Sequence, residues 1–458
     1  MTVNVAGHEL VLSPREAYRV ARAEVERTPR ALKTWYGFLL AVMAIGGVGA
    51  LLTIAPGTEV FGTTPSFEWG ILIAAYVFFA ITTSGLCLGS SLGTVFGIDM
   101  FRPLEKRHAI LAVLSLTTAF GIIALDLHYP VRMVFGAVFN PSFSSPMWWM
   151  GLFYAVYLVF LLVEVVSMFT GRDNIHRYAC LASSCTAILA PSTLGAVFGV
   201  VYAHAFWYGL FTPITMLMTA LLAGTALLGI VFYFVVRFQL AGFERGRRLA
   251  IPAIRILLVV GLVGSLLLLG RGLWSGLTSD DVALHGGTMA LVSGPLAIPF
   301  WVRVIGGLAL PLLLIALPVT RTVTGTGIAA GLAFVGVITD RLLFVIAGQI
   351  IPTTTVGGVA SDTFVPYVPS LVEISIVLAA FAFVAFMYTL AERYLDLRES
   401  EVHIGFHLPN VTGAVRERLA ARRTAGEPAE PVEPGEPDQP REPDQPGQPV
   451  GVTAGGEA

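Results

Sequence analysis

Four polar side chains of different chemistry lie within seven positions at the end of an apolar run. The stretch GIIALDLHYPVRMV, residues 121–134, contains Asp126, His128, Tyr129 and Arg132. A carboxylate and an imidazole can exchange protons near neutral pH, whereas a phenol and a guanidinium donate hydrogen bonds. We therefore expect this stretch to handle protons and to contact a polar ligand.

Four further residues are expected at the same depth of the protein: Glu68, Trp148, Trp149 and His204. Flat aromatic walls suit a planar ring with an isoprenoid tail. The combined set therefore favours a quinone pocket near the outer interface, with Arg132 or His204 bonding a quinone oxygen. The alternative is that Trp148, Trp149 and Tyr129 belong to an interfacial aromatic belt and that Arg132 is a loop cation.

The elements that must position these residues are transmembrane helices. The chain has 458 residues, of which 55% are hydrophobic and 13% charged, whereas soluble domains carry about 25% charged residues. A span needs about 20 apolar residues. This criterion predicts about ten spans, at residues 34–55, 68–99, 107–127, 147–170, 177–200, 209–237, 252–275, 297–318, 325–350 and 370–392. The expected fold is an all-α polytopic membrane protein.

A weak internal repeat predicts how these spans assemble. The second and sixth spans both begin with a tryptophan and reach a small residue at nearly the same depth, Gly85 and Gly224. Two parallel four-helix bundles, spans 2–5 and spans 6–9, follow from the repeat, with spans 1 and 10 outside them. The alternative, which we favour for Gly85, Gly89 and Gly93, is that small residues at four-residue spacing form an ordinary helix-packing surface.

The distribution of cations predicts that both termini are cytoplasmic and that residues 121–134 face outward. Lys and Arg in short loops are retained in the cytoplasm, and they gather in the N-terminal segment and in every second loop after it. We expect a multi-pass protein of the cell membrane. Its predicted parts are a cytoplasmic N-terminal segment at 1–33, the membrane domain at 34–392, a juxtamembrane segment at 393–423 and a disordered Pro- and Glu-rich tail at 424–458.

One carboxylate lies deep within a span. Glu164 is about 25 Å along the fourth span from its outer start, at 1.5 Å per residue, and Tyr157 shares its face. Hydroxyl-bearing residues on the second and third spans lie between these two depths: Thr83, Ser84, Thr117 and Thr118. Together they are candidates for a proton path from the cytoplasm to the outer pocket. The alternative is that each hydroxyl bonds its own helix backbone.

A second group of ionisable residues lies at the outer ends of spans 7 to 10: Arg271, Arg303, Asp340, Arg341 and Glu373. Three arginines on that side oppose the trend of the other loops, so carboxylate partners are expected, and Asp340 and Glu373 are available. Charged groups within spans are usually paired or functional. We favour a structural ion-pair network over a ligand site for this group.

Several classes of chemistry are not indicated. Every histidine lies at a span end or outside the spans, so no haem is expected within the bilayer. The three cysteines form no CxxC pair, so neither an iron–sulfur cluster nor a metal site is expected in this chain. There is no nucleotide-binding or hydrolytic motif where its mechanism needs it, and no basic patch for nucleic acid. Electrons for any redox reaction must therefore come from another subunit.

Several segments taken together resemble the NrfD/PsrC family, the membrane subunits of polysulfide-reductase-like complexes. They are WGILIAAYVFFAITTSGLCLGSSLG, the pairing of DLHYPVRM with NPSFSSPMWWMGLFYAVYLVFLLVE, and PSTLGAVFGVVYAHAFWYGLFTPITMLMTALLAG. DRLLFVIAGQIIP followed by YVPSLVEISIVLAAFAFVAFMYTLAERYLDL is similar to the longer, ten-span branch of HybB-type hydrogenase and alternative complex III membrane subunits. The resemblance covers most of residues 65–395.

The resemblance implies a haem-free anchor of two four-helix bundles. Such subunits bind menaquinone or ubiquinone in the first bundle near the outer face and exchange electrons with a ferredoxin-like iron–sulfur protein docked there. The family often has Asp-x-Gly-Arg-Pro at the end of the third span, and here Asp126 and Pro130 match while the Gly and Arg do not. Members also often carry a His before the Ser/Thr–Gly patch of the fifth span, where this chain has Ala190 and Pro191 before Ser192.

The sequence thus predicts a quinone-reactive membrane subunit of a multisubunit respiratory oxidoreductase, with the catalytic centre for the other substrate in a separate catalytic subunit. Asp126 and His128 would handle protons, and Tyr129 with Trp148 or Trp149 would border the quinone ring. Two alternatives remain open: a secondary transporter, since parallel repeats and intramembrane charge also occur there, and a structural anchor without quinone chemistry.

Overall fold

The computed structural model describes residues 2–5, 8–11, 29–54, 60–65, 67–127, 141–237, 244–351, 364, 367–395 and 397. The chain divides into two units, residues 1–406 and 407–458, and all described residues belong to the first. His128, Tyr129 and Arg132 lie outside the described residues, as do the predicted tail and most of the N-terminal and juxtamembrane segments.

Ten helices in the described part of the chain are long and apolar enough to cross a membrane, which confirms the predicted number of spans. Only a helix satisfies every backbone N–H and C=O within one apolar segment, so each run of about 20 apolar residues folds this way. The spans are α2 (Arg30–Ile54), α3 (Ile71–Thr94), α4 (Glu105–Asp126, preceded by a 3-10 turn Asp99–Leu104), α6 (Pro146–Thr170), α7 (Asp173–Gly199), α8 (Phe211–Arg237), α9 (Glu244–Leu277), the composite α11 (Ala297–Trp301), π-helical Val302–Ala309 and α12 (Leu310–Ala316), α13 (Val323–Ala347) and α14 (Leu371–Tyr394).

Four short elements lie outside the spans. β1 (Thr2–Val5) and β2 (His8–Val11) pair as an antiparallel hairpin, and a 3-10 turn at Pro318–Thr320 follows α12. Helix α10 (Val282–Val292) occupies a segment that the sequence predicts as a plain connection. Its start is stabilised by Asp281, whose side chain accepts hydrogen bonds from the backbone of Ala283 and Leu284.

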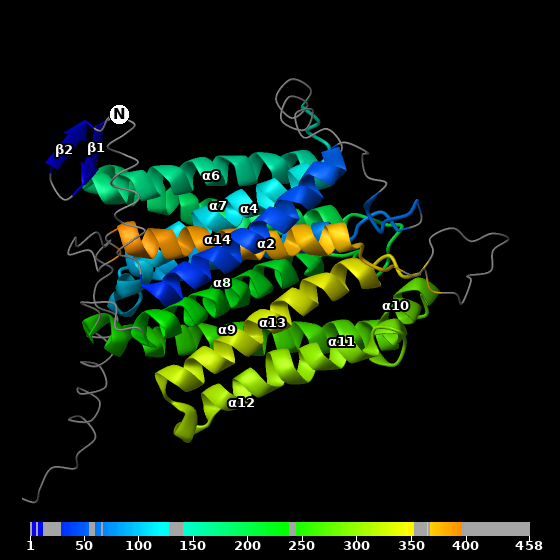
Figure 1. Cartoon of the computed structure of the whole chain (residues 1–458). Helices are drawn as coiled ribbons and strands as arrows, with labels where there is room; N and C mark the ends of the chain where they lie inside the picture. Colours follow the sequence, from blue (N-terminus) through cyan, green and yellow to red (C-terminus); the bar gives the residue numbers. More distant parts are fainter. Residues whose placement is uncertain are drawn as a thin grey trace, which may run out of the picture. The chain divides into compact units, whose positions relative to one another are not determined.

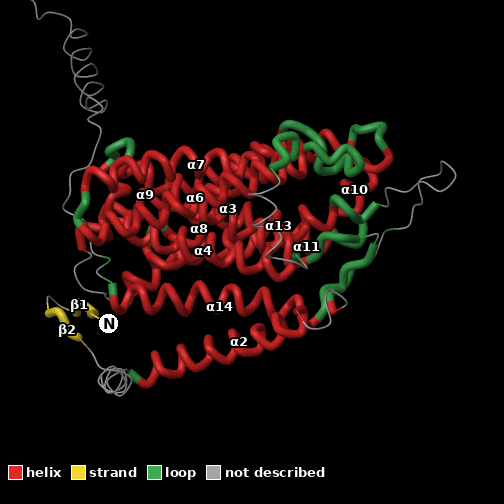
Figure 2. Tube along the Cα trace, turned by 90° about the horizontal axis from the view of Figure 1, so that it is seen from above, coloured by secondary structure: helices red, strands yellow, loops and turns green. Residues whose placement is uncertain are grey.

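The spans form the two predicted bundles (Figure 1). Helices α3, α4, α6 and α7 pack on one another as bundle 1, and α8, α9, the composite span and α13 form bundle 2. Helices α2 and α14 pack against each other, and α14 also contacts α4; Figure 2 shows them side by side along one flank. We call the side at which α3, α6 and α8 begin the α3 side, and the opposite side the α4 side.

Helices α3 and α8, the first helices of the two bundles, cross in close contact. A Cβ atom on Gly85 would meet the backbone carbonyl of Ala220, and one on Gly224 would meet the backbone of Gly85 and Leu86. Glycine at both positions therefore sets the distance between the bundles. The two positions that the internal repeat aligns thus contact each other, and the packing role favoured for Gly85 is correct.

The two tryptophans of the repeat also meet. Trp69 and Trp207 stack with ring centroids 5.1 Å apart and an interplanar angle of 20°. Phe198 packs edge-on against both rings, and the indole N–H of Trp207 donates to the carbonyl of Phe344 at 2.7 Å. This aromatic cluster joins α3, α7 and α13 at the α3 side, so both ends of the repeat lie on the bundle–bundle interface.

Candidate functional site

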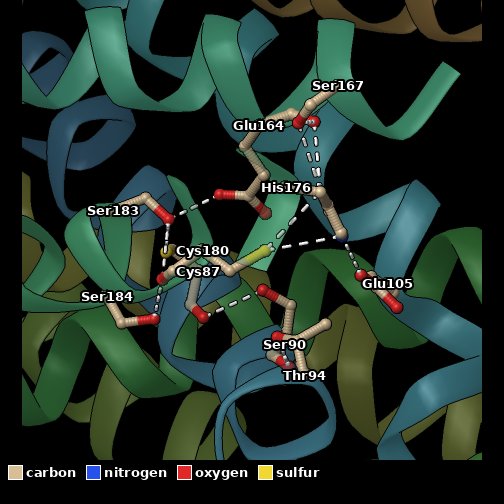
Figure 3. A network of polar contacts seen from close by, with 10 residues as sticks. All are labelled: Cys87, Ser90, Thr94, Glu105, Glu164, Ser167, His176, Cys180, Ser183 and Ser184. Carbon is tan, nitrogen blue, oxygen red and sulfur yellow. Dashed lines mark hydrogen bonds and ion pairs between the residues drawn. The ribbon is translucent and has the colours of Figure 1, made fainter. Parts of the chain in front are cut away.

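A buried polar network lies in bundle 1 toward the α4 side (Figure 3). The carboxylate of Glu164, 2% exposed, accepts a hydrogen bond from the hydroxyl of Ser183. His176 Nε2 lies 2.7 Å from Oε1 of Glu105, and His176 Nδ1 lies 3.3 Å from the backbone carbonyl of Glu164. The thiol of Cys180 is 3.5 Å from His176 Nε2. Three helices therefore supply one connected set of ionisable groups.

The tight turn between α6 and α7 brings these residues together. Helix α6 ends at Gly171, whose φ of +66° lies in the left-handed region that glycine adopts without strain. Helix α7 then runs back along α6, so Glu164 faces His176 and Ser183. Glu105 reaches the network from the first turn of α4, which begins on the same side.

The network continues toward the middle of the bundle through hydroxyl and thiol groups. Cys87 Sγ lies 3.7 Å from the hydroxyl of Ser183, and the Cys87 thiol also interacts with Tyr157. The Tyr157 hydroxyl donates to the backbone carbonyl of Thr83 at 3.1 Å. The Thr83 hydroxyl lies 3.0 Å from the carbonyl of Phe79, its own-helix acceptor, and 3.3 Å from that of Ala112 on α4. All of these groups are buried in the interior of bundle 1.

Three further buried hydroxyls lie near Thr83: Ser84 of α3, Ser115 of α4 and Tyr154 of α6. The Tyr154 hydroxyl contacts that of Ser84, and the Ser115 hydroxyl has no hydrogen-bond partner among the described residues. Most buried polar side-chain atoms have a partner in the protein or in ordered water, so the unpaired Ser115 hydroxyl marks a place for water or a ligand. The hydroxyl of Tyr76, nearer the α3 side, lies 3.6 Å from the sulfur of Met150.

We call this series the polar chain; its members, from the α4 side toward the α3 side, are Glu105, His176, Cys180, Glu164, Ser183, Cys87, Tyr157, Thr83, Ser84, Tyr154 and Tyr76. Four residues of the predicted proton path belong to it: Glu164, Tyr157, Thr83 and Ser84. Thr117 does not, because it is exposed on the outside of α4. Thr118 is buried, but its hydroxyl donates to the carbonyl of Leu114 in its own helix, the alternative role considered for such residues.

Sequence reasoning missed Glu105, His176, Cys180 and Ser183. The signal available was the spacing of His176, Cys180 and Ser183, which repeats every three to four residues and therefore lies on one helical face. His176 was read only as a residue at a span end. The first turn of a helix can face the interior of a bundle, and the first turn of α7 places His176 there.

Asp126, at the α3-side end of α4, lies in a group of acidic residues and a tyrosine. Its carboxylate interacts electrostatically with that of Glu373. Glu373 is 1% exposed and accepts hydrogen bonds from the hydroxyl of Tyr367 and the backbone N–H of Gly62 and Ser370. Burial and the two neighbouring carboxylates raise the pKa of Tyr367, so its hydroxyl stays protonated and donates to Glu373.

The other residues predicted for the outer pocket form two further groups. His204 packs on the ring of Trp207, with centroids 4.7 Å apart, and interacts electrostatically with the exposed Glu68. Burial lowers the pKa of His204, which favours the neutral imidazole. Trp149 donates from its indole nitrogen to the carbonyl of Phe143 at 2.8 Å and packs edge-on against Trp148. The described contacts therefore do not join these two groups to Asp126.

The second predicted group also divides. Asp340 lies between Arg303, at 2.5 Å, and Arg341, with which it makes two contacts, and all three side chains are buried in bundle 2. Arg271 is exposed and lies over the ring of Phe211, 3.3 Å from its centroid. Glu373 differs from the expectation that it would face an arginine: its carboxylate is taken by backbone N–H groups and Tyr367, because it completes a capping box with Ser370 at the start of α14.

Comparison with known proteins identifies this architecture. The family model described as polysulphide reductase, NrfD, matches residues 59–353, which contain both bundles. The chain belongs to the NrfD family. The resemblance expected from the sequence is thereby confirmed.

Two relatives of this NrfD protein cover most of its length. The "Hdr-like menaquinol oxidoreductase integral membrane subunit" of Archaeoglobus fulgidus is 27% identical over 78% of this chain and 92% of its own length. A selenate reductase subunit of Mesobacillus selenatarsenatis is 23% identical over 81% of this chain and 96% of its own length. Both names describe subunits of oxidoreductases, so partner subunits fit this NrfD protein as well.

The polar chain has the composition needed to pass protons through bundle 1. Carboxylate, imidazole, thiol and hydroxyl groups can each accept a proton and release another. An ionisable group without a permanently charged partner can gain or lose a proton without breaking an ion pair. Glu164 is such a group, because it accepts its hydrogen bond from the neutral hydroxyl of Ser183. The Arg303–Asp340–Arg341 cluster of bundle 2 has the opposite character, because its carboxylate is held by permanent cations within the cluster.

Proposed function

We propose that this chain is the quinone-reactive membrane subunit of a multisubunit respiratory oxidoreductase, and that bundle 1 is the part that reacts. The observation that carries the proposal is the polar chain, a series of buried protonatable groups in one of two otherwise similar bundles. Family membership and the names of the two relatives support the same conclusion. The menaquinol named in the archaeal relative favours menaquinone as the quinone.

The residues present fit a quinone ring near the middle of bundle 1. Quinone oxygens accept hydrogen bonds, and the Ser84, Ser115 and Tyr154 hydroxyls are buried donors, of which Ser115 lacks a partner among the described residues. Asp126 lies at the end of α4 beyond them, and Trp148 and Trp149 open α6 on the same side. When bound, a quinol supplies two electrons and two protons for the reaction.

The chain's own residues then handle the protons. Asp126, with His128 in the neighbouring segment, would exchange them with the α3 side. Tyr129, Trp148 or Trp149 would border the ring, and Arg132 or His204 would bond a quinone oxygen. The polar chain would connect the ring position to Glu164 and onward to Glu105 at the α4 side.

We further propose that the α3 side faces outward and the α4 side faces the cytoplasm of the cell membrane, because cationic residues gather in the loops of the α4 side. A ferredoxin-like iron–sulfur subunit would dock on the outer face, and a catalytic subunit would take or supply its electrons. This chain would contribute no haem and no iron–sulfur cluster of its own.

The experiment compares quinol-linked turnover of the intact complex carrying Glu164→Gln with that of the wild type. Glutamine keeps the shape and the hydrogen bond to Ser183 but cannot carry a proton. We expect turnover to fall about a hundredfold, the loss typical of a removed proton-transfer group, while the complex still assembles. The matched control is Asp173→Asn, an exposed carboxylate at the start of α7 on the same side, with turnover unchanged.

Each of the other outcomes selects a different function. Unchanged turnover of Glu164→Gln with an intact complex would refute the proton role and favour a structural anchor. A protein that purifies from its native membranes without any partner subunit or quinone, under conditions that preserve respiratory complexes, would favour a secondary transporter.

A further inference from the structure

Three potential metal ligands converge at the α4-side end of the polar chain. A carboxylate oxygen of Glu105, the imidazole of His176 and the thiol of Cys180 all lie within 4.8 Å of one another (Figure 3). Glu105 comes from the first turn of α4, and the other two come from the first two turns of α7. The fold therefore brings together one oxygen, one nitrogen and one sulfur from two different helices.

The separation of nitrogen and sulfur fits a tetrahedral zinc ion. Zinc binds histidine nitrogen at about 2.0 Å and cysteine sulfur at about 2.3 Å, so two such ligands at the tetrahedral angle are about 3.5 Å apart. His176 Nε2 and Cys180 Sγ are 3.5 Å apart. The Glu105 oxygen is closer to Nε2, at 2.7 Å. Ligand bond lengths near 2.0 Å place such a pair about 3.3 Å apart, so the carboxylate needs to move by about 0.6 Å.

The orientation of the imidazole also suits a metal ligand. His176 Nδ1 faces the backbone carbonyl of Glu164 at 3.3 Å and the hydroxyl of Ser167 at 3.5 Å. A proton on Nδ1 donated to that carbonyl leaves the lone pair of Nε2 directed at Glu105 and Cys180. Metal-binding histidines almost always donate their other ring N–H to a carbonyl or carboxylate in this way.

Burial and charge favour a soft divalent cation over magnesium or calcium. Cys180 is 3% exposed, and the side chains of His176 and Glu105 are 6% and 12% exposed. A thiolate, a carboxylate and a neutral imidazole balance a doubly charged ion completely. Thiolate and imidazole are favourable zinc ligands, whereas magnesium and calcium need oxygen ligands.

We propose that Glu105, His176 and Cys180 form a binding site for Zn²⁺ at the α4-side end of the polar chain. The carboxylate of Glu164 contacts the Cys180 thiol and lies beside these three ligands, but it is not one of them. Binding displaces the proton of the thiol to solvent and forms a zinc–sulfur bond. The proposal concerns binding alone and holds whether or not the chain reacts with quinone.

Cobalt binding tests the site directly. The full chain, purified in detergent and treated with a chelator, is titrated with Co²⁺, which occupies zinc sites and absorbs through a thiolate-to-cobalt charge-transfer band. We expect one Co²⁺ per chain with that band, displaced by added Zn²⁺. Cys180→Ser should lose the band, and His176→Asn should bind at least about tenfold more weakly. The matched control is Cys185→Ser, which removes an exposed cysteine from the same helix and should bind as the wild type does.

Three results would overturn the proposal. The first is the absence of the charge-transfer band in the wild type, and the second is a band that survives in Cys180→Ser. A melting curve with and without Zn²⁺ covers the case in which a variant fails to fold. The wild type and Cys185→Ser should both melt at a higher temperature with Zn²⁺, and equal melting with and without it in both would also overturn the proposal.

Discussion

Bundles 1 and 2 both bury ionisable side chains, but they compensate the charge in different ways. In bundle 2, Asp340 is held between Arg303 and Arg341, so the buried carboxylate is matched by permanent partners. In bundle 1, the Glu164 carboxylate contacts the Ser183 hydroxyl and the Cys180 thiol and lies near His176, whose own protonation can change. Matched charges hold helices together without a proton exchange, whereas a carboxylate among neutral groups can gain and lose a proton. Under the proposed function, the two bundles therefore have different roles.

The largest effect that distinguishes the bundles is expected on stability. Asp340→Asn leaves Arg303 and Arg341 buried without a carboxylate, and removing one partner of a buried ion pair destabilises by about 3–5 kcal/mol. The expected result is a large fall in the melting temperature of the complex in detergent. Glu164→Gln, which leaves no charge unpaired, should change the melting temperature far less.

A charge-free replacement of the cluster provides the control. The triple variant Arg303→Met, Asp340→Leu, Arg341→Met removes all three charges and should recover most of the stability lost in Asp340→Asn, because buried ion pairs are often no better than apolar residues of similar volume. A triple variant that folds well but has no quinol-linked turnover would contradict the comparison, since it would give bundle 2 a role in the reaction.

The second prediction concerns the middle of the polar chain. Tyr157→Phe removes the hydroxyl that bonds the carbonyl of Thr83 beside Cys87, without changing the packing of the ring. We expect quinol-linked turnover to fall about tenfold to a hundredfold and the melting temperature to stay near that of the wild type. Thr117→Val is the matched control, since its hydroxyl lies on the outside of α4. Equal losses in both variants would remove the distinction between the polar chain and other hydroxyls.

The span positions were predictable from the sequence, because runs of about 20 apolar residues have few other structures available in a membrane. The family was predictable from the segments that resemble the NrfD/PsrC family. Glu164 and Tyr157 were predictable from the spans, since a fixed helical spacing places them on one face. Glu105 and His176 were not, because their contact depends on which helices are neighbours, and composition does not determine that.

The role of Glu373 was readable from the sequence in a different way. Ser370 and Glu373 have the spacing of a capping box, Ser-x-x-Glu, at the start of an apolar run. The count of charges on one side of the membrane instead predicted that Glu373 forms an ion pair with an arginine. Local hydrogen bonds to backbone N–H groups satisfy a carboxylate as well as a cation does, and they form at much shorter range in the chain.

The third prediction tests the contact that holds the two bundles side by side. Gly85→Ala places a methyl group against the backbone of α8, and such overpacking costs about 1–3 kcal/mol. Gly121→Ala, where nothing lies within 4 Å, is the control and should be neutral or slightly stabilising. Melting temperatures of the two variants measure the difference. A tolerated Gly85→Ala would mean that the bundles can move apart, and the Trp69–Trp207 stack would then be the main contact between them.

The smallest expected effect lies in that aromatic cluster and depends on pH. Burial against Trp207 lowers the pKa of His204 in the folded protein, so the unfolded chain binds a proton more readily. Stability linked to His204 is therefore present above its ordinary value of about 6.5 and decreases as the pH falls below it. Melting temperatures at about pH 7.5 and about pH 5.5 should differ more for the wild type than for His204→Asn. If the melting temperatures at the two pH values differ equally for the wild type and His204→Asn, Glu68 offsets the effect of burial on His204. The junction between the bundles would then resemble the charge-matched cluster of bundle 2 and not the polar chain of bundle 1.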